Sequence, residues 1–223
     1  GATTAAVTGS GTTYNVAVSG MANSGTVIAT IPAGVAVDAS NNANLASSSA
    51  DNTVTYDVAI PTVTINRAVA QADPTNSSPV NFTVEFNEPV FGFTSNDITL
   101  GGTAGATTAV VSGSGTTYNV AVGGMVTDGT VTAALGAAVV TDVTGNSNVA
   151  ATSTDNEVTY NTTNPTILVE KAAGQADPTN LPTIDFTVTF SELVVGFTNT
   201  DVVLGGTAGA NNVVITGAGP VYT

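Results

Sequence analysis

The chain has 223 residues, of which 42% are hydrophobic, 16 are acidic and only 2 are basic, giving a formal net charge of −14. This composition predicts a folded protein with room for about two domains of ordinary size. The charge excludes nucleic acid and anionic membranes as favourable partners, because two basic side chains cannot neutralise a phosphate backbone. An acidic surface with so few cations suits a secreted protein that recruits divalent ions.

The residue types that are absent exclude several kinds of functional chemistry. Neither Cys nor His occurs, which removes disulfides, the commonest general base and the commonest transition-metal ligand. No stretch approaches the roughly 18 apolar residues of a transmembrane helix, so direct membrane insertion is not expected. Residue 1 opens no signal segment, and we expect any export signal or anchor to lie outside this chain.

The chain is a tandem array in which each position recurs 104 residues later. Residues 1–60 match residues 105–164, and in the last copy 30 of 59 residues are identical to their counterparts in 61–119. Shared low complexity cannot explain so many identities. We therefore predict the C-terminal part of a first repeat at 1–60, a complete repeat at 61–164 and the N-terminal part of a third repeat at 165–223.

The predicted elements of the complete repeat are short strands. Val80, Phe82, Val84 and Phe86 alternate with polar residues, which is the period of a half-buried strand. Further strands are predicted at 62–65, 97–100, 108–112, 117–122, 129–135 and 157–160, with a Gly-containing hairpin connection at 113–116. Seven short strands in about a hundred residues predict an all-β, immunoglobulin-like sandwich.

The junctions between repeats are short. Residues 56–61 and 160–165 run from a Tyr to a Pro with no long Gly/Ser linker. The Pro limits the freedom of the chain, so neighbouring repeats are expected to sit close together as a semi-rigid array.

The repeat resembles the bacterial Ig-like repeats of large surface and secreted proteins. Beyond the alternating strand, the segments that carry the resemblance are Glu88-Pro-Val, Gly92-Phe-Thr-Ser-Asn-Asp97, Gly113-Ser-Gly-Thr-Thr-Tyr118, Gly129-Thr-Val and Asp142-Val-Thr-Gly-Asn146-Ser-Asn148. The resemblance implies β-sandwiches strung in long arrays within adhesins, biofilm proteins and other extracellular assemblies, often with calcium near the ends of the modules. It implies less about the ligand, because one fold serves many functions.

Acids that recur at the same phase are candidate calcium ligands. They fall in predicted loops or at strand edges, where carboxylate, amide and backbone oxygens of a tight turn are the ligands calcium takes. The alternative is turn chemistry, since Asp, Asn and Gly also cap loop backbones. The candidate calcium ligands are Asp38, Asn42, Asn44, Asp73, Glu88, Asp97, Asp142, Asn146, Asn148, Asp177, Glu192 and Asp201.

The two basic residues, Arg67 and Lys171, share one phase just after the first predicted strand. Each is either a solvated charge or one half of a salt bridge to an acid of a neighbouring repeat. A salt bridge on the surface contributes little to the free energy of folding. The recurring tyrosines, such as Tyr118, are predicted to be core residues with satisfied hydroxyl groups.

These patterns predict a non-enzymatic structural module, a stalk, spacer or fibre element in adhesion or biofilm matrix outside a bacterial cell. Its expected partners are neighbouring repeats and, through self-association, further copies. One alternative is a filament subunit joined head to tail by strand complementation. Residues 209–223 repeat the phase of residues 1–15, so in such a filament the two segments would compete for the same position in the completed sandwich. A carbohydrate-binding module is the other alternative, and it would need exposed aromatic residues in a chain without Trp.

Overall fold

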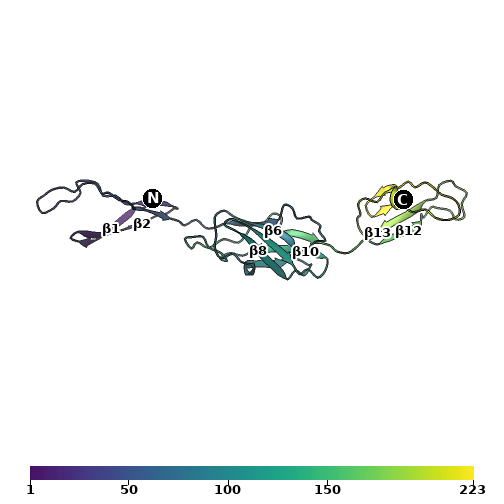
Figure 1. Cartoon of the computed structure of the whole chain (residues 1–223), viewed down its shortest axis with the longest axis horizontal. Coiled ribbons are helices and arrows are strands. Elements are labelled where there is room, and N and C mark those ends of the chain that lie inside the picture. The colour runs from purple at the N-terminus through teal and green to yellow at the C-terminus, as the bar shows by residue number, and fades with distance from the viewer. The chain divides into compact units, whose positions relative to one another are not determined.

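The computed structural model describes residues 1–223, which separate into two units, 1–161 and 162–223 (Figure 1). The first unit contains residues 1–60 and nearly all of the complete repeat, and the second contains the third repeat. The structure is all-β: its helical turns are η1 (Ser95–Asp97) and η2 (Asn199–Asp201). No helix is long and apolar enough to cross a bilayer.

The complete repeat forms two sheets. One has four strands in the order β5-β6-β9-β8, and the other has three in the order β11-β10-β7. All strand pairs within them are antiparallel. Their bounds are β5 (Val63–Arg67), β6 (Val80–Phe86), β7 (Ile98–Gly101), β8 (Thr108–Ser114), β9 (Thr117–Gly123), β10 (Gly129–Leu135) and β11 (Glu157–Tyr160). The predicted immunoglobulin-like sandwich is confirmed, and each predicted strand lies within a residue or two of an observed one.

Alternating side chains of β6 form the centre of the core. Val80, Phe82 and Val84 are completely buried, whereas Glu85 between them and Phe86 is exposed. From the other sheet, Val131 and Val158 are also completely buried and belong to the same cluster. Each such side chain contributes about 1.5–3 kcal/mol when removed from water, so the two sheets are held together chiefly by this layer.

Three aromatic rings close one part of this core. Tyr118 packs edge-on against Phe93, with ring centroids 4.9 Å apart, and against Phe86 at 5.9 Å. Edge-to-face contacts of this kind add stabilisation beyond burial. Tyr118 is buried and its hydroxyl donates to the carbonyl oxygen of Val90 at 3.5 Å, as expected for a core tyrosine. The arrangement recurs in the third repeat in Phe190, Phe197 and Tyr222.

The hairpin between β8 and β9 depends on glycine. Gly115 in the connection has φ +72°, in the left-handed region that glycine adopts without steric cost. Gly113 has φ +119°, and a Cβ atom placed there would lie 2.6 Å from the carbonyl oxygen of Thr117. The Gly-Ser-Gly spacing therefore determines where the two strands turn.

Residues 1–60 form two antiparallel pairs that match the later strands of the complete repeat. They are β1 (Thr4–Ser10) with β2 (Thr13–Ser19), and β3 (Gly25–Ile28) with β4 (Thr53–Tyr56). Val54 of β4 is 67% exposed, whereas its counterpart Val158 is completely buried. The difference arises because the strands that cover Val158 have no counterparts within residues 1–60.

The second unit contains the first strands of the third repeat. Its sheet has the order β12-β13-β15-β14, formed by β12 (Ile167–Lys171), β13 (Phe186–Phe190), β15 (Val221–Tyr222) and β14 (Gly217–Ala218). Phe186, the counterpart of Phe82, is 50% exposed. The same sequence pattern therefore leads to burial only where a facing sheet is present.

The repeat supplies a matched test of this core. Phe82→Ala is expected to lower the free energy of unfolding of the complete repeat by about 3–5 kcal/mol, because it empties a fully buried site. Phe186→Ala makes the same chemical change at a half-exposed position and should leave that transition unchanged. Denaturant unfolding of the full chain measures both, and equal losses in the two variants would contradict the observed core.

Candidate cation site at the repeat junction

The loop that follows β10 presents a carboxylate held in place by its own backbone. Asp142 accepts hydrogen bonds from the backbone NH groups of Thr144 and Asn146 at 2.8 and 2.9 Å, and from the Asn146 side-chain amide at 2.8 Å. Desolvation acts to raise the pKa of Asp142, but these bonds from Asn146 and Thr144 outweigh it and lower the pKa to about 2. Asp142 is buried, and its low pKa keeps it ionised at neutral pH.

Glu88 approaches the same place from the turn after β6. Its side chain is partly buried, and its Oε1 atom is buried without a hydrogen-bond partner. Desolvation is the largest cause that raises the pKa of Glu88, followed by the charges of Asp142 and Asp57. A buried acceptor without a hydrogen-bond partner lowers the stability of the folded state. The Oε1 atom of Glu88 carries this cost, because no group of the protein donates a hydrogen bond to it.

The third carboxylate comes from the junction that precedes the complete repeat. Asp57 directly follows β4, and one oxygen of each of Asp57, Glu88 and Asp142 lies within 4.8 Å of the others. Asp57 is oriented by Ser24, whose hydroxyl donates to Oδ1 at 2.7 Å, and by the backbone NH of Ala59 at 2.9 Å. One acid from the end of a repeat thus meets two from the next.

This arrangement suits a hard divalent cation. No basic residue belongs to the group, since Arg67, the one base of the complete repeat, pairs with Asp155. Calcium binds carboxylate and carbonyl oxygens at about 2.3–2.6 Å, and the three carboxylate oxygens, each within 4.8 Å of the others, are close enough for one ion to lie among them. The buried Oε1 atom of Glu88, which has no hydrogen-bond partner, is a second observation that favours a cation at this position.

The structure brings together only some of the predicted ligands. Glu88 and Asp142 meet in the cluster, and Asn146 lies beside them, with its amide donating to the backbone carbonyl of Asp57 at 3.4 Å. Asn148 instead braces its loop: its Oδ1 accepts from Val139 and Val140, and its amide donates to two carbonyl groups. All four of its hydrogen-bonding positions are therefore occupied.

The first repeat contains a copy of the same loop. Asp38 accepts from the side-chain amide of Asn42 at 3.0 Å and from its backbone NH at 2.8 Å, and these bonds lower the pKa of Asp38. Asn44 braces residues 32–36 as Asn148 does in the complete repeat. The position in phase with Glu88 would lie before residue 1.

The remaining predicted ligands occupy other places. Asp97 and Asp201 each close a turn by accepting from the backbone and hydroxyl of a Thr three residues earlier. Asp73 accepts from the backbone NH of Thr159 at 2.9 Å, and Asp177 lies 3.7 Å from the Lys171 ammonium. Glu192 lies in the turn after β13, at the phase of Glu88.

Comparison of the repeats did not single out Asp57, because its counterpart is Asn161 rather than an acid. A signal was nevertheless present. Ser24 and Asp57 belong to the first junction, and Asp128 and Asn161 occupy the same two phases at the second. At these two phases, each junction therefore has one acid and one neutral side chain that carries an oxygen atom. A search for oxygen ligands of any kind at recurring positions would have included Asp57.

Comparison with known families agrees with the fold. Residues 57–160 match the model of the bacterial Ig-like domain, a stretch that begins at Asp57 and ends with β11. Over this stretch, a little under half of the chain, the protein is similar to the bacterial Ig-like domain. Such Ig-like domains are typically non-enzymatic structural modules and commonly occur in surface or extracellular proteins. Neither the curated proteins nor the solved structures gave a significant match to the chain.

Without a cation, the cluster should destabilise the Ig-like domain at neutral pH. Because the pKa of Glu88 is raised in the folded state, its ionised form disfavours folding, and this penalty disappears once pH falls below the ordinary value of 4.5. Glu88→Gln should therefore be more stable than the wild type at pH 7 in chelator. That advantage should shrink as pH is lowered toward 4.5, as measured by denaturant unfolding.

Glu85→Gln is the matched control for this variant. It removes one carboxylate from the exposed face of β6, three residues from Glu88. It should show no comparable advantage at pH 7. An equal gain in both variants would mean that reduced net charge, not the cluster, is responsible.

Proposed function

We propose that the chain is part of a repeat array on a bacterial surface or in a secreted protein, where its Ig-like domains serve as stalk, spacer or fibre elements in adhesion or biofilm matrix. The observation that carries this proposal is the complete sandwich of the 61–164 repeat, which the Ig-like family model matches over residues 57–160 and which recurs in phase on both sides. Short junctions that join one domain directly to the next support a role in spacing rather than in catalysis.

The distribution of side chains supports a structural role over an enzymatic or carbohydrate-binding one. The aromatic residues Phe82, Phe86 and Tyr118 lie in the core, and Phe91 is the exposed large aromatic residue of the complete repeat. A sugar platform would need more such rings on one surface. The clustered carboxylates lie at the junction between repeats, where a bound ion would join two domains rather than activate a substrate.

Calcium is the cofactor we propose for the junction. Asp57, Glu88 and Asp142 would hold it, and its charge would replace the repulsion among three carboxylates with attraction to a common centre. Because Asp57 belongs to the segment between domains, the ion would restrict the motion of one repeat against the next. The proposal thus links the acidic composition to the stiffness of the array.

Calcium binding can be tested by thermal and denaturant unfolding of the full chain. Free calcium at about a hundred times its Kd should add about 2.7 kcal/mol to the free energy of unfolding of the Ig-like domain. Glu88→Gln and Asp57→Asn should each abolish most of this gain, whereas Glu85→Gln should retain it. A wild-type transition that is the same in calcium and in chelator would exclude the site.

The extracellular setting requires a separate test. Antibodies against the chain should label intact cells of the producing bacterium, or the material shed around them, without permeabilisation. A cytoplasmic protein labelled in parallel controls for leakage. Labelling that appears only after permeabilisation would overturn the proposed setting while leaving the fold and the cation site untouched.

A further inference from the structure

One side of the complete sandwich is closed by the segments that open and close the repeat. We call residues 61–75 and 149–161 together the seam. The backbone NH of Thr152 donates to the carbonyl oxygen of Val63 in β5 at 3.0 Å, and Thr75 forms a parallel bridge to the last residue of β11. The outer strand of each sheet therefore has a partner on this side.

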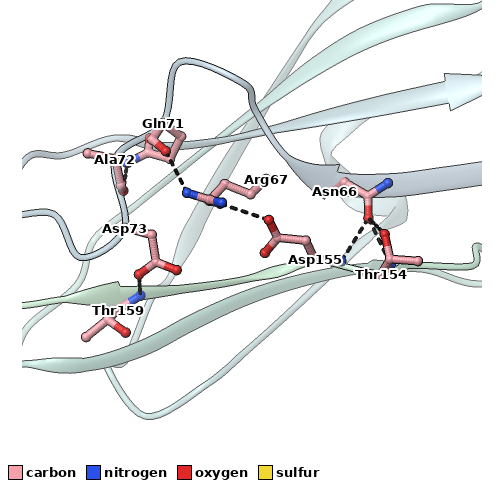
Figure 2. A network of polar contacts seen from close by, with 8 residues as sticks. All are labelled: Asn66, Arg67, Gln71, Ala72, Asp73, Thr154, Asp155 and Thr159. Atoms are coloured by element: carbon pink, nitrogen blue, oxygen red, sulfur yellow. Dashed lines mark hydrogen bonds and ion pairs between the residues drawn. The ribbon is translucent and has the colours of Figure 1, made fainter.

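Polar side chains add further bonds to the seam, as Figure 2 shows. The Oδ1 atom of Asn66 accepts from the backbone NH groups of Thr154 and Asp155 at 3.0 and 3.1 Å. The Nε atom of Arg67 lies 3.0 Å from Oδ2 of Asp155. Arg67 is therefore neither a free solvated charge nor a partner of a neighbouring repeat, the two alternatives drawn from the sequence.

The opposite side of the sandwich ends in the strands β7 and β8. Each is the last strand of its sheet, and the two lie next to each other. The backbone NH of Val111, in the middle of β8, donates to the hydroxyl of Ser95 in η1 at 3.1 Å, so it points away from β9. Because backbone groups alternate in direction along a strand, those of Ala109 point the same way. This outer edge offers positions for one more strand.

The edge of β8 lacks the features that usually prevent pairing with another chain. Natural edge strands are kept apart by charged side chains, proline, bulges or short length. β8 has seven residues, Thr108-Ala-Val-Val-Ser-Gly-Ser114, with neither a charge nor a proline among them. Val110 in its middle is 61% exposed. The bond to Ser95 occupies one donor of the edge.

The charges of the molecule lie away from this side. Residues 98–127, which include β7, β8 and β9, contain no charged side chain, although the chain has a net charge of −14. The segments in phase with them, 1–23 and 202–223, are also uncharged. Two copies repel each other over most of their surface, and they approach with least repulsion here. A basic partner would instead be attracted to the acidic surface elsewhere.

The same edge recurs along the array. The counterpart of β8 in the first repeat is β1, with the sequence Thr4-Ala-Ala-Val-Thr-Gly-Ser10, and it too lies at the edge of its sheet. An array therefore presents an uncharged edge once in every 104 residues. A second array has the same spacing, so several weak contacts can form together and strengthen one another. This periodicity favours another copy of the chain as the partner.

We propose that β8 is a lateral contact through which copies of this chain associate edge to edge. The two β8 strands pair antiparallel about a two-fold axis and join two four-stranded sheets into one, so the same surface is used on both copies. Main-chain hydrogen bonds supply the affinity. Ser95 restrains the association, because its bond to Val111 has to be released first. The contact adds a lateral partner to the array and depends neither on the cation site nor on the cellular setting.

Sedimentation of the full chain in chelator, over a range of protein and salt concentrations, tests the association. Dimers should form, and they should become more stable as salt rises, because salt screens the repulsion between copies. Val110→Glu should weaken the association about tenfold, since the substituted position occurs twice in the contact. A chain that stays monomeric up to about 1 mM in high salt would overturn the proposal.

Val69→Glu is the matched control for this variant. Val69 is a fully exposed valine in the seam, on the opposite side of the sandwich from β8. The substitution adds the same negative charge and should leave the association unchanged. Equal weakening in the two variants would mean that net charge, and not the edge of β8, controls the association, and it would contradict the contact.

Ser95→Ala tests the edge with a change in the opposite direction. It frees the backbone NH of Val111 without adding a charge, and it should strengthen the association several-fold. Denaturant unfolding of the same variant checks that the complete repeat remains folded. Unchanged or weaker association of the folded variant would show that this donor takes no part in the contact, and would overturn the pairing.

Spin labels show which surfaces of two copies meet. The incomplete repeats expose apolar residues such as Phe186 and offer a second route of association. Because the chain has no Cys, Val110→Cys and Val69→Cys each provide a single labelling site. Labels at position 110 should lie within about 20 Å of each other, a few strand spacings, and labels at position 69 should lie farther apart. Absence of the short distance at position 110 in the dimer would overturn edge pairing.

Discussion

Burial of the alternating β6 side chains between two sheets is the constraint on which the rest of this structure depends. Phe82 and its neighbours reach zero exposure because β10 and β11 cover them from the other sheet. Where the covering strands are missing, the same residue types stay exposed, as Val54 and Phe186 show. The strands carry a strong local pattern, but the core exists only when the beginning and the end of one repeat are both present.

That requirement also explains where the polar groups converge. Once the sandwich closes, the turn after β6 and the loop at Asp142 lie at the same end of the domain, next to the chain that enters from the preceding repeat. Carboxylates that are 54 positions apart in the sequence, such as Glu88 and Asp142, therefore share one small volume. A cation bound at this junction would relieve their mutual repulsion and pair the buried oxygen of Glu88.

The seam is a second consequence of the same closure. Residues 61–75 and 149–161 are far apart in the chain, yet they must run together for the first strand and the closing segment to flank one core. Several of the charged side chains of the complete repeat lie here and at the junction, among them Arg67, Asp155 and Asp142. The remaining surface is rich in Thr, Ser, Asn and small residues, which connect the strands without adding further charged contacts.

The sequence by itself determined the repeat length, the all-β class and the strands, because those depend on period-two hydrophobic patterns and turn residues that act locally. It also selected Glu88 and Asp142 as candidate ligands through their recurrence. Only the tertiary structure decided that Asp57 joins them, that Asn148 braces a loop instead, and that Arg67 meets Asp155. Such pairings depend on which segments become neighbours after two sheets pack face to face, and no local pattern of charges records that arrangement.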